Sequence, residues 1–440
     1  MLGRFRLIGL LLIIAAFAYV FYSKSKKRRG TSRGDFHRDV FAAHITRFAD
    51  PPPMDQGRTV AVSSDGGPVD VRSDGCRQQR YATSDTRRLT ASLVVDLPGD
   101  GVDLKRFYSN VDSLLSGSEQ TENGLVDEVI VVAAAGLDGP AAAEVDRYVT
   151  SLAVVSRFVR NAGTGQVSAR TAGAKLALSP VVVFADWRAV GTVGWLRPLL
   201  ATLAVEPESI VVPHFVDASD PTLLVTTSEH LLAEYMWPLS VRMMANASAL
   251  PTSHGLYRSS ALRGDVFAVR RQFWDELGGY DEALGDDSAG ASVELSIRAW
   301  QCGSDAGAIV TNRCSHVGVG DLGRVVRVVE PSSVRHIARL WFGDRRAIVM
   351  RTVGVSPDPR HADADARPAG KRDDCRNIDT YFNDVAVLPV PSTDAVHFGQ
   401  LRADTGKLHG ISRYHNSSCT NGRIKPKRST QPPTLNGKGN

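Results

Sequence analysis

An acid and an arginine follow a buried strand near the middle of this chain. Residues 181–185 are all apolar, Asp186 ends the run, and Arg188 comes two residues later. An acid at the carboxyl end of a parallel strand lies where such sheets bind ligands. Its carboxylate can hold a divalent cation that neutralises a leaving diphosphate. A second interpretation is that Asp186 only ends the strand or caps the helix that follows.

Arg188 offers a different way to neutralise the same charge. A fixed guanidinium binds phosphate oxygens through paired hydrogen bonds, so Arg188 could replace a cation beside Asp186. The alternative is an arginine that faces solvent in a site that has lost its chemistry. The sequence leaves both interpretations open.

Apolar runs that alternate with helical patterns must position these two residues. The runs at 92–97 (SLVVDL), 128–136 (EVIVVAAAG), 181–185 and 210–216 (IVVPHFV) are typical of buried strands. Helical sequence lies between them, including 194–205, and residues 293–302 predict an amphipathic helix. The alternation predicts an α/β protein with a doubly wound, mostly parallel sheet.

Charge and length exclude some classes of function. The chain has 440 residues, 43% of them apolar, and a formal net charge of +5. Basic residues at the two ends outweigh this charge, so the body is near neutral and no nucleic-acid partner is expected. These basic residues are Lys24, Lys26, Lys27, Arg28 and Arg29 at one end and Lys425, Lys427 and Arg428 at the other.

The first residues predict a membrane anchor. Residues 7–22 are apolar and uncharged, which favours an uncleaved signal anchor that forms a single transmembrane helix behind a short cytoplasmic tail, 1–6. Two patterns oppose this: 16–18 resembles a cleavage site, and the basic run at 24–29 favours the reverse orientation. Asn246 and Asn416 begin glycosylation sequons that would be used only in the secretory lumen.

Composition divides the remainder of the chain. Residues 23–64 are a polar stem, and 65–354 form the main domain. Residues 355–374, rich in Pro, Asp, Ala and Arg, predict a linker or surface loop. A C-terminal extension of the domain covers 375–415, and 416–440 predict a disordered tail.

Several segments in order resemble the polypeptide N-acetylgalactosaminyltransferases of the secretory pathway. They are DVRSDGC from 70, GQVSAR from 165, VGWLRPLL from 193, VFAVRRQFWDELGGYDE from 266, VELSIRAWQCG from 293, RCSHVG from 313 and VRHIARLWFGD from 334. The resemblance covers roughly 70–390. It implies a GT-A nucleotide-sugar fold on a type II Golgi anchor, with UDP-GalNAc as donor, Mn²⁺ as cofactor and protein Ser or Thr as acceptor.

The resemblance also implies which residues hold the donor. Gly165 and Arg170 match a segment beside the nucleotide, although Ser168 replaces a family arginine. Asp186 matches the first ligand of an Asp-x-His metal motif that here reads Asp-Trp-Arg. Asp186 and Arg188 are therefore expected to face the diphosphate.

Other family positions have lost their chemistry. The acid pair that helps to hold UDP corresponds to Ala133 and Ala134, the third metal ligand to Val319, and the glutamate of a Trp-Gly-Gly-Glu loop to Ala291. Asp186 would be the only protein ligand left of three. His316 could turn toward a metal, but a structural histidine is the simpler interpretation.

Cysteines and the chain end complete the comparison. The resemblance implies disulfides Cys76–Cys314 and Cys302–Cys375. Cys419 has no partner in this pairing. It is either a free thiol in the tail or a residue that forms a disulfide with a partner chain. Family members carry a β-trefoil lectin domain, and too few residues follow Cys375 for its three lobes, so no lectin domain is expected.

Two classes of function follow. One is a working transferase in which Asp186 and Arg188 face the diphosphate. The other is an inactive GT-A pseudoenzyme that binds a luminal protein partner, and the loss of acids at 133–134 favours it. A membrane-embedded polysaccharide synthase is disfavoured because no second apolar stretch is long enough to span a bilayer.

Overall fold

The computed structural model describes residues 70–79, 89–118, 124–161, 163–218, 231–236, 239–245, 256–303, 309–320, 327–352, 375–382, 400–401 and 408–409. The chain forms two units, Met1–Pro391 and Ser392–Asn440. In the second, β13 (Gln400–Leu401) and β14 (Leu408–His409) pair as an antiparallel ribbon.

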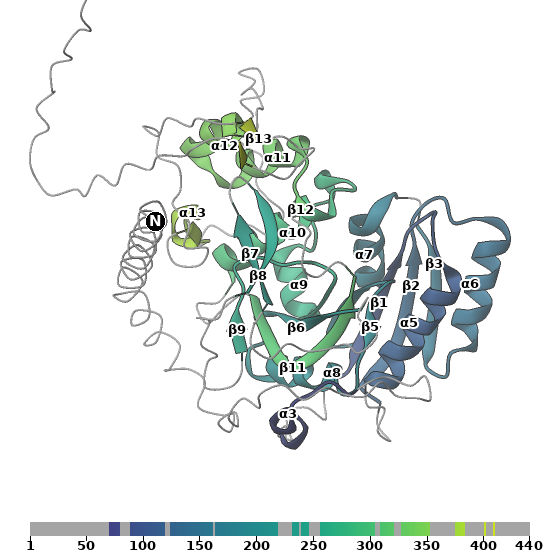
Figure 1. Cartoon of the computed structure of the whole chain (residues 1–440). Helices are drawn as coiled ribbons and strands as arrows, with labels where there is room; N and C mark the ends of the chain where they lie inside the picture. Colours follow the sequence, from purple (N-terminus) through teal and green to yellow (C-terminus); the bar gives the residue numbers. More distant parts are fainter. Residues whose placement is uncertain are drawn as a thin grey trace, which may run out of the picture. The chain divides into compact units, whose positions relative to one another are not determined.

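A nine-stranded sheet organises the described part of the first unit (Figure 1). Its order is β3-β2-β1-β4-β10-β6-β11-β5, and β9 also pairs with β11. The strands are β1 (Ala91–Leu97), β2 (Val126–Ala133), β3 (Val155–Arg160), β4 (Val181–Asp186), β5 (Val190–Gly191), β6 (Ile210–Asp217), β9 (Leu256–Arg258), β10 (Val266–Arg270) and β11 (Ile309–Val319). The predicted strands correspond to β1, β2, β4 and β6 and are confirmed.

Four parallel strands, β3-β2-β1-β4, form the half of the sheet that the predicted site needs. The helices α5 (Leu104–Gly117) and α6 (Gly139–Ser151) carry the chain outward from β1 to β3 on one face. Helix α7 (Gly165–Leu176) returns it to β4 on the other face, as right-handed crossovers require. This half is doubly wound.

The prediction of a mostly parallel sheet is wrong for the other half. Strand β10 runs antiparallel to both β4 and β6, and β11 is antiparallel to β5 and β9. The backbone N–H of Asp186 donates to the carbonyl of Asp265 at 2.8 Å, just before β10 begins. A strand that starts at the carboxyl end of β4 must run back along it, so the sheet is mixed.

Further helices surround the second half of the sheet. They are α3 (Asp74–Gln78), α8 (Leu196–Val205), α9 (Arg271–Leu277), α10 (Ser288–Cys302), α11 (Pro331–Trp341), α12 (Arg346–Thr352) and α13 (Ile378–Thr380). A separate three-stranded sheet has the order β12 (Arg327–Val328), β8 (Ser240–Ala245) and β7 (Leu231–Met236). Helix α8 confirms the helix predicted at 194–205.

The sequence predicts that the helix at 293–302 is amphipathic, and this is wrong. It belongs to α10, whose side chains are buried on all sides from 289 to 302. Glu294 and Arg298 form an ion pair of 2.5 Å within it, one turn apart, and both side chains are fully buried. The second Glu294 oxygen accepts from the indole of Trp341 at 3.1 Å. Because each charge is paired and hydrogen-bonded, a helix with charged residues can cross the core.

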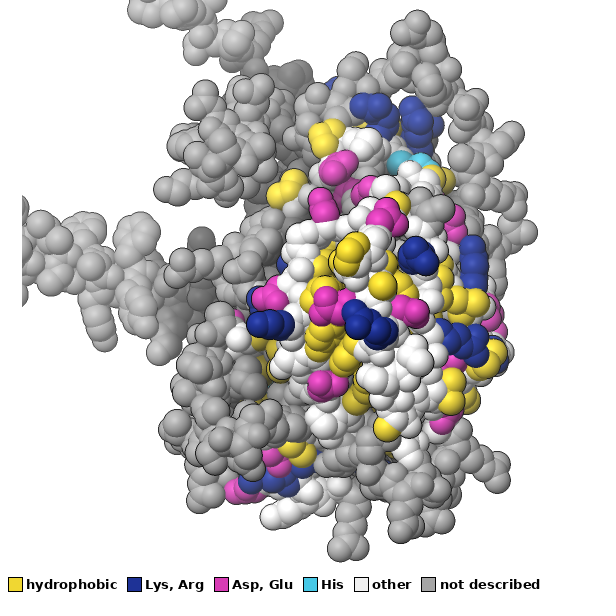
Figure 2. All heavy atoms as spheres, turned by 90° about the vertical axis from the view of Figure 1, so that its right-hand side faces the viewer, with side chains coloured by type: hydrophobic (Ala, Val, Ile, Leu, Met, Phe, Trp, Pro, Cys, Tyr) yellow, Lys and Arg dark blue, Asp and Glu magenta, His cyan; other side chains and the backbone are white. Residues whose placement is uncertain are grey.

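One edge of the large sheet faces solvent at β3. Arg160 at its end is exposed, and the Val155 side chain at its start is 65% exposed. Charged side chains on such a strand oppose pairing with another chain. On this side of the molecule, acidic and basic side chains are interspersed (Figure 2).

Several predictions concern residues outside the described part of the chain. These are the anchor at 7–22, the stem, the linker at 355–374, the tail, Asn246, Asn416 and Cys419. Among the described helices, none has the length and apolar character to cross a bilayer.

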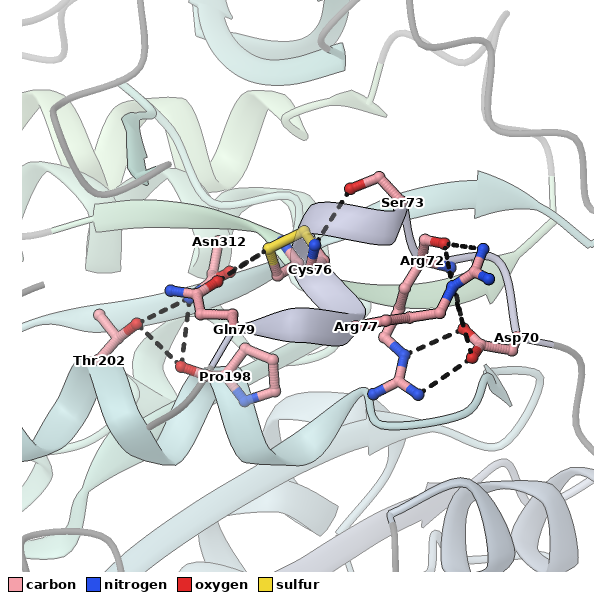
Figure 3. Close-up of a disulfide and its surroundings, with 10 residues drawn as sticks. Asp70, Arg72, Ser73, Cys76, Arg77, Gln79, Pro198, Thr202 and Asn312 are labelled. Atoms are coloured by element: carbon pink, nitrogen blue, oxygen red, sulfur yellow. Dashed lines mark hydrogen bonds and ion pairs between the residues drawn. A yellow bond between two sulfur atoms is a disulfide. The ribbon is translucent and has the colours of Figure 1, made fainter. Parts of the chain in front are cut away.

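Both predicted disulfides are present. Cys76 of α3 is bonded to Cys314 of β11, and Cys302 at the end of α10 is bonded to Cys375. Figure 3 shows the first disulfide beside Asn312, whose amide nitrogen donates to the Thr202 hydroxyl at 3.0 Å. The first cross-link therefore joins the N-terminal segment to β11 of the large sheet, and the second joins the C-terminal extension to α10.

Replacing Cys302 with serine should lower the free energy of unfolding by about 4 kcal/mol, because the bond closes a loop with a sequence separation of 73. Urea denaturation of the full chain measures this. Cys419→Ser is the control and should have little effect. Equal losses for both variants would contradict a structural difference between the two cysteines.

Candidate functional site

A cleft of about 570 Å³ opens at the carboxyl ends of β1, β2 and β4, beside the start of α7. Its lining includes the predicted residues Gly165, Asp186 and Arg188, and also Ala134. The remaining lining residues are Asp96, Leu97, Pro98, Gly99, Asp100, Ala135, Gly136, Thr164, Gln166, Ala169, Trp187, Asp286 and Ser288. The structure thus brings Gly165, Asp186 and Arg188 together at one cleft.

Arg188 binds the carboxylate of Asp186 with both oxygens engaged. Its Nε donates to Oδ1 at 2.9 Å, its Nη2 donates to Oδ2 at 2.9 Å, and its backbone N–H donates to Oδ1 at 2.8 Å. Burial would raise the pKa of Asp186, but these bonds and the Arg188 charge hold it below its usual range. Asp186 therefore neither caps α8 nor stands alone: it forms an ion pair within one turn of chain.

The residues present do not fit a divalent cation. Both oxygens of Asp186 already accept from a guanidinium, and the positive charge of Arg188 would repel an approaching metal ion. Within the described ranges, no three His, Cys, Asp or Glu side chains are grouped to hold a metal. Manganese chemistry is thus not supported by this donor set.

The sequence analysis missed a second acid, Asp96 at the end of β1. Asp96 is in register with Asp186 on the neighbouring parallel strand, and its side chain is only 7% exposed. Burial is the main cause that raises the pKa of Asp96 to about 6, and the nearby Asp186 adds to it, while Arg170 opposes it. The signal was available: SLVVDL carries an acid near its end, just as VVVFAD does.

Arg170 is brought to the site but does not line the cleft. Its side chain is fully buried, and its Nε donates to Asp96 Oδ1 at 2.6 Å. Nη2 donates to the Asp265 carbonyl at 3.1 Å, and Nη1 donates to the Gly264 carbonyl. Arg170 is thus a structural anchor behind Asp96, which corrects its predicted contact with the donor.

The spacing along α7 explains this arrangement. Gln166, Arg170 and Gly173 lie on one face of the helix, and that face packs on the sheet. A Cβ at Gly173 would collide with Val94 of β1, so glycine allows the close approach. Val94 and Asp96 share a face of β1, which places the carboxylate under α7, where the Gln166 amide donates to it at 2.9 Å.

At the positions where this sequence differs from the family's site residues, the side chains are apolar or structural. Ala133 is fully buried at the end of β2, and Ala291 is fully buried in α10. Val319, 3% exposed at the end of β11, is not among the residues that line the cleft. Ser168 accepts from the Asn161 amide at 2.7 Å.

His316 also lies away from the cleft. It is buried on β11, with its ring centroid 5.4 Å from that of His214. Burial first, and then the neighbouring His214, hold the pKa of His316 well below its usual range. A neutral, buried ring agrees with the structural interpretation of this histidine.

The mouth of the cleft is acidic and carries one aromatic side chain. Asp100 and Asp286 are exposed there, and Trp187 is half-buried. The Arg188 guanidinium lies 5.8 Å from the centre of a Trp187 ring. Asp100 and Asp286 were not predicted, because only the fold brings 100 and 286 to the opening where Trp187 lies between Asp186 and Arg188.

This architecture is the GT-A fold of glycosyltransferases. A solved structure titled "Crystal structure of GalNAc-T7 with UDP, GalNAc and Mn2+" superposes with a TM-score of 0.59 at 19% identity, covering 72% of this chain and 60% of that one. The fold built on this mixed sheet is therefore similar to that of GalNAc-T7.

Sequence comparison confirms the resemblance to polypeptide N-acetylgalactosaminyltransferases. The human polypeptide N-acetylgalactosaminyltransferase 13 is 27% identical over 298 residues, which is 62% of this chain and 50% of that protein. The inactive polypeptide N-acetylgalactosaminyltransferase-like protein 5 of Macaca fascicularis is 27% identical over 255 residues, 56% of this chain and 55% of that protein. No family model matches the chain. It spans about half the length of these relatives.

Replacing Arg170 with methionine should destabilise the domain by about 3–5 kcal/mol, because Asp96 would then be buried beside Asp186 without its counter-charge. The double variant Asp96→Asn/Arg170→Met should lose less than the sum of the two single variants. Urea denaturation measures the cycle. Arg160→Met at the exposed end of β3 is the control. Additive losses would mean that the ion pair does not couple α7 to β1.

Proposed function

We propose that this protein is a polypeptide N-acetylgalactosaminyltransferase-like GT-A protein of the secretory pathway that has lost manganese-dependent transfer and acts by binding. The resemblance supports the family origin of the fold. The state of the cleft supports the loss of metal-dependent chemistry. Its partner would be a protein or glycan of the same compartment.

The pairing of Asp186 with Arg188 carries this proposal. A diphosphate leaving group needs compensating positive charge as its bond to the sugar breaks. In the cleft, the acid at the metal position instead accepts two hydrogen bonds from the Arg188 guanidinium and one from the Arg188 backbone N–H. The chain has thus replaced a binding site for a metal ion by an ion pair of its own.

One observation favours a second candidate, a metal-independent transferase. The Arg188 side chain is 52% exposed and lines the cleft, so part of the guanidinium is accessible from it. It could contact a diphosphate directly while it remains bonded to Asp186. Transfer would then need no manganese and would depend on Arg188.

The purified full chain should show no manganese-dependent transfer of GalNAc from UDP-GalNAc to a Ser/Thr peptide. The paramagnetic resonance signal of free Mn²⁺ should not fall when protein is added. Arg188→Ala should increase Mn²⁺ binding, because it frees the Asp186 carboxylate, whereas Arg188→Ala/Asp186→Asn should not. Transfer that persists in chelator and is lost in Arg188→Ala would support the second candidate. Robust manganese-dependent transfer would refute both.

We also propose a single-pass type II orientation in the Golgi membrane, with the body in the lumen. The apolar segment 7–22 and the cysteines that form disulfides support it, because disulfides persist in oxidising compartments.

If the body is luminal, Asn246 should be glycosylated when the full chain is expressed in animal cells. Endoglycosidase should then increase the mobility of the protein on a gel, and Asn246→Gln should reduce that shift. Asn123→Gln, which is outside any sequon, should leave the shift unchanged. A protein without any shift would count against the luminal body.

A further inference from the structure

The charges around the cleft oppose an anionic ligand. Asp186 is neutralised by Arg188, and Asp96 by Arg170 behind it. Asp100 and Asp286 form no ion pair with the described side chains, so they leave the mouth net negative. A diphosphate that entered would meet two carboxylates without a bridging cation.

The same lining suits a ligand that donates many hydrogen bonds and has an apolar face. Asp286 and the Ser288 hydroxyl at the start of α10, and the Gln166 amide of α7, border the cleft. Carboxylates accept hydrogen bonds strongly from hydroxyl groups. Trp187 adds a half-buried indole. The backbone carbonyl of Trp187 accepts a hydrogen bond from the Asn110 side-chain amide at 3.1 Å. The indole packs partly against the core and also lines the cleft, so it offers an apolar surface there.

Gly165 sets the position of the carboxylate at the mouth. Its φ of 75° lies in the left-handed region, and a Cβ there would collide with the carboxyl group of Asp286. Glycine thus lets Asp286 lie against the first turn of α7. Thr164, the N-cap residue, makes no side-chain cap, so the turn keeps backbone N–H groups beside the cleft.

We propose that the cleft binds a neutral sugar, by stacking on Trp187 and by hydroxyl hydrogen bonds to Asp286 and Gln166, without nucleotide or metal. The volume of about 570 Å³ is in the range of small-molecule sites, about 300–1,000 Å³. This inference rests on the proposed function, in which the fold acts by binding. The sugar is either free or the end of a glycan.

The test is titration of the full chain in chelator, followed by saturation-transfer NMR. The neutral probes are N-acetylgalactosamine, N-acetylglucosamine, galactose and mannose, and the anionic probes are UDP and glucuronic acid. At least one neutral sugar should bind, at least tenfold more tightly than either anion. In a second arm, the affinity for immobilised neutral glycans is measured. If a glycan binds more tightly than the matching monosaccharide, the site is assigned to glycan ends.

Two variants make the prediction specific. Asp286→Asn should weaken sugar binding roughly tenfold, the scale for a hydrogen bond to a charged group, and should strengthen UDP binding because it removes negative charge. Asp275→Asn, exposed on α9 and outside the cleft, is its control. Trp187→Ala should abolish the sugar signal, with the exposed Leu178→Ala as its control.

The outcomes separate the two proposals. Three results would overturn this inference. They are tighter binding of UDP than of every neutral sugar, sugar binding that is unchanged in both variants, and no sugar binding at all. With transfer also absent, those results leave the proposed function standing. Manganese-dependent transfer would overturn the proposed function itself.

Discussion

The buried ion pair between Asp96 and Arg170 is the constraint on which the arrangement of the cleft depends. One arginine joins α7 to the end of β1 and, through two backbone carbonyls, to the turn that starts β10. Its guanidinium also lies 5.9 Å from the ring centre of Phe184 on β4. The Arg170 side chain thus contacts β1, β4 and the turn before β10 at the same time.

The pair also determines how two acids can lie side by side. Asp96 and Asp186 are in register on adjacent strands, where like charges repel. Each acid has its own arginine, one from α7 and one from the turn after β4. The charges are thus compensated inside the protein, and the cleft does not need an external cation for its stability. This compensation is a physical reason why the fold is stable with Arg188 two residues after Asp186.

Different parts of the molecule hold the scaffold together and line the cleft. Both disulfides and the Glu294–Arg298 pair hold the second half of the molecule, away from the cleft. Arg188, at the histidine position of the family motif, lies at the opening, where its side chain is 52% exposed. Side chains at a cleft mouth can change chemistry at little cost to packing, whereas those under α7 cannot.

The sequence by itself determined the α/β class, four strands, two helices and, by resemblance, both disulfides, and it indicated Asp186, which lines the cleft. These follow from local periodicity and from the acid that ends an apolar run. Tertiary structure alone decided that β10 runs antiparallel, that Arg170 lies behind Asp96, and that Asp100, Trp187 and Asp286 share one opening. The physical reason is that strand direction and side-chain partners depend on contacts between residues 70 to 190 positions apart. Such contacts leave no periodic signal in the chain, and burial, which sets the partner of each charge, exists only once the elements have packed.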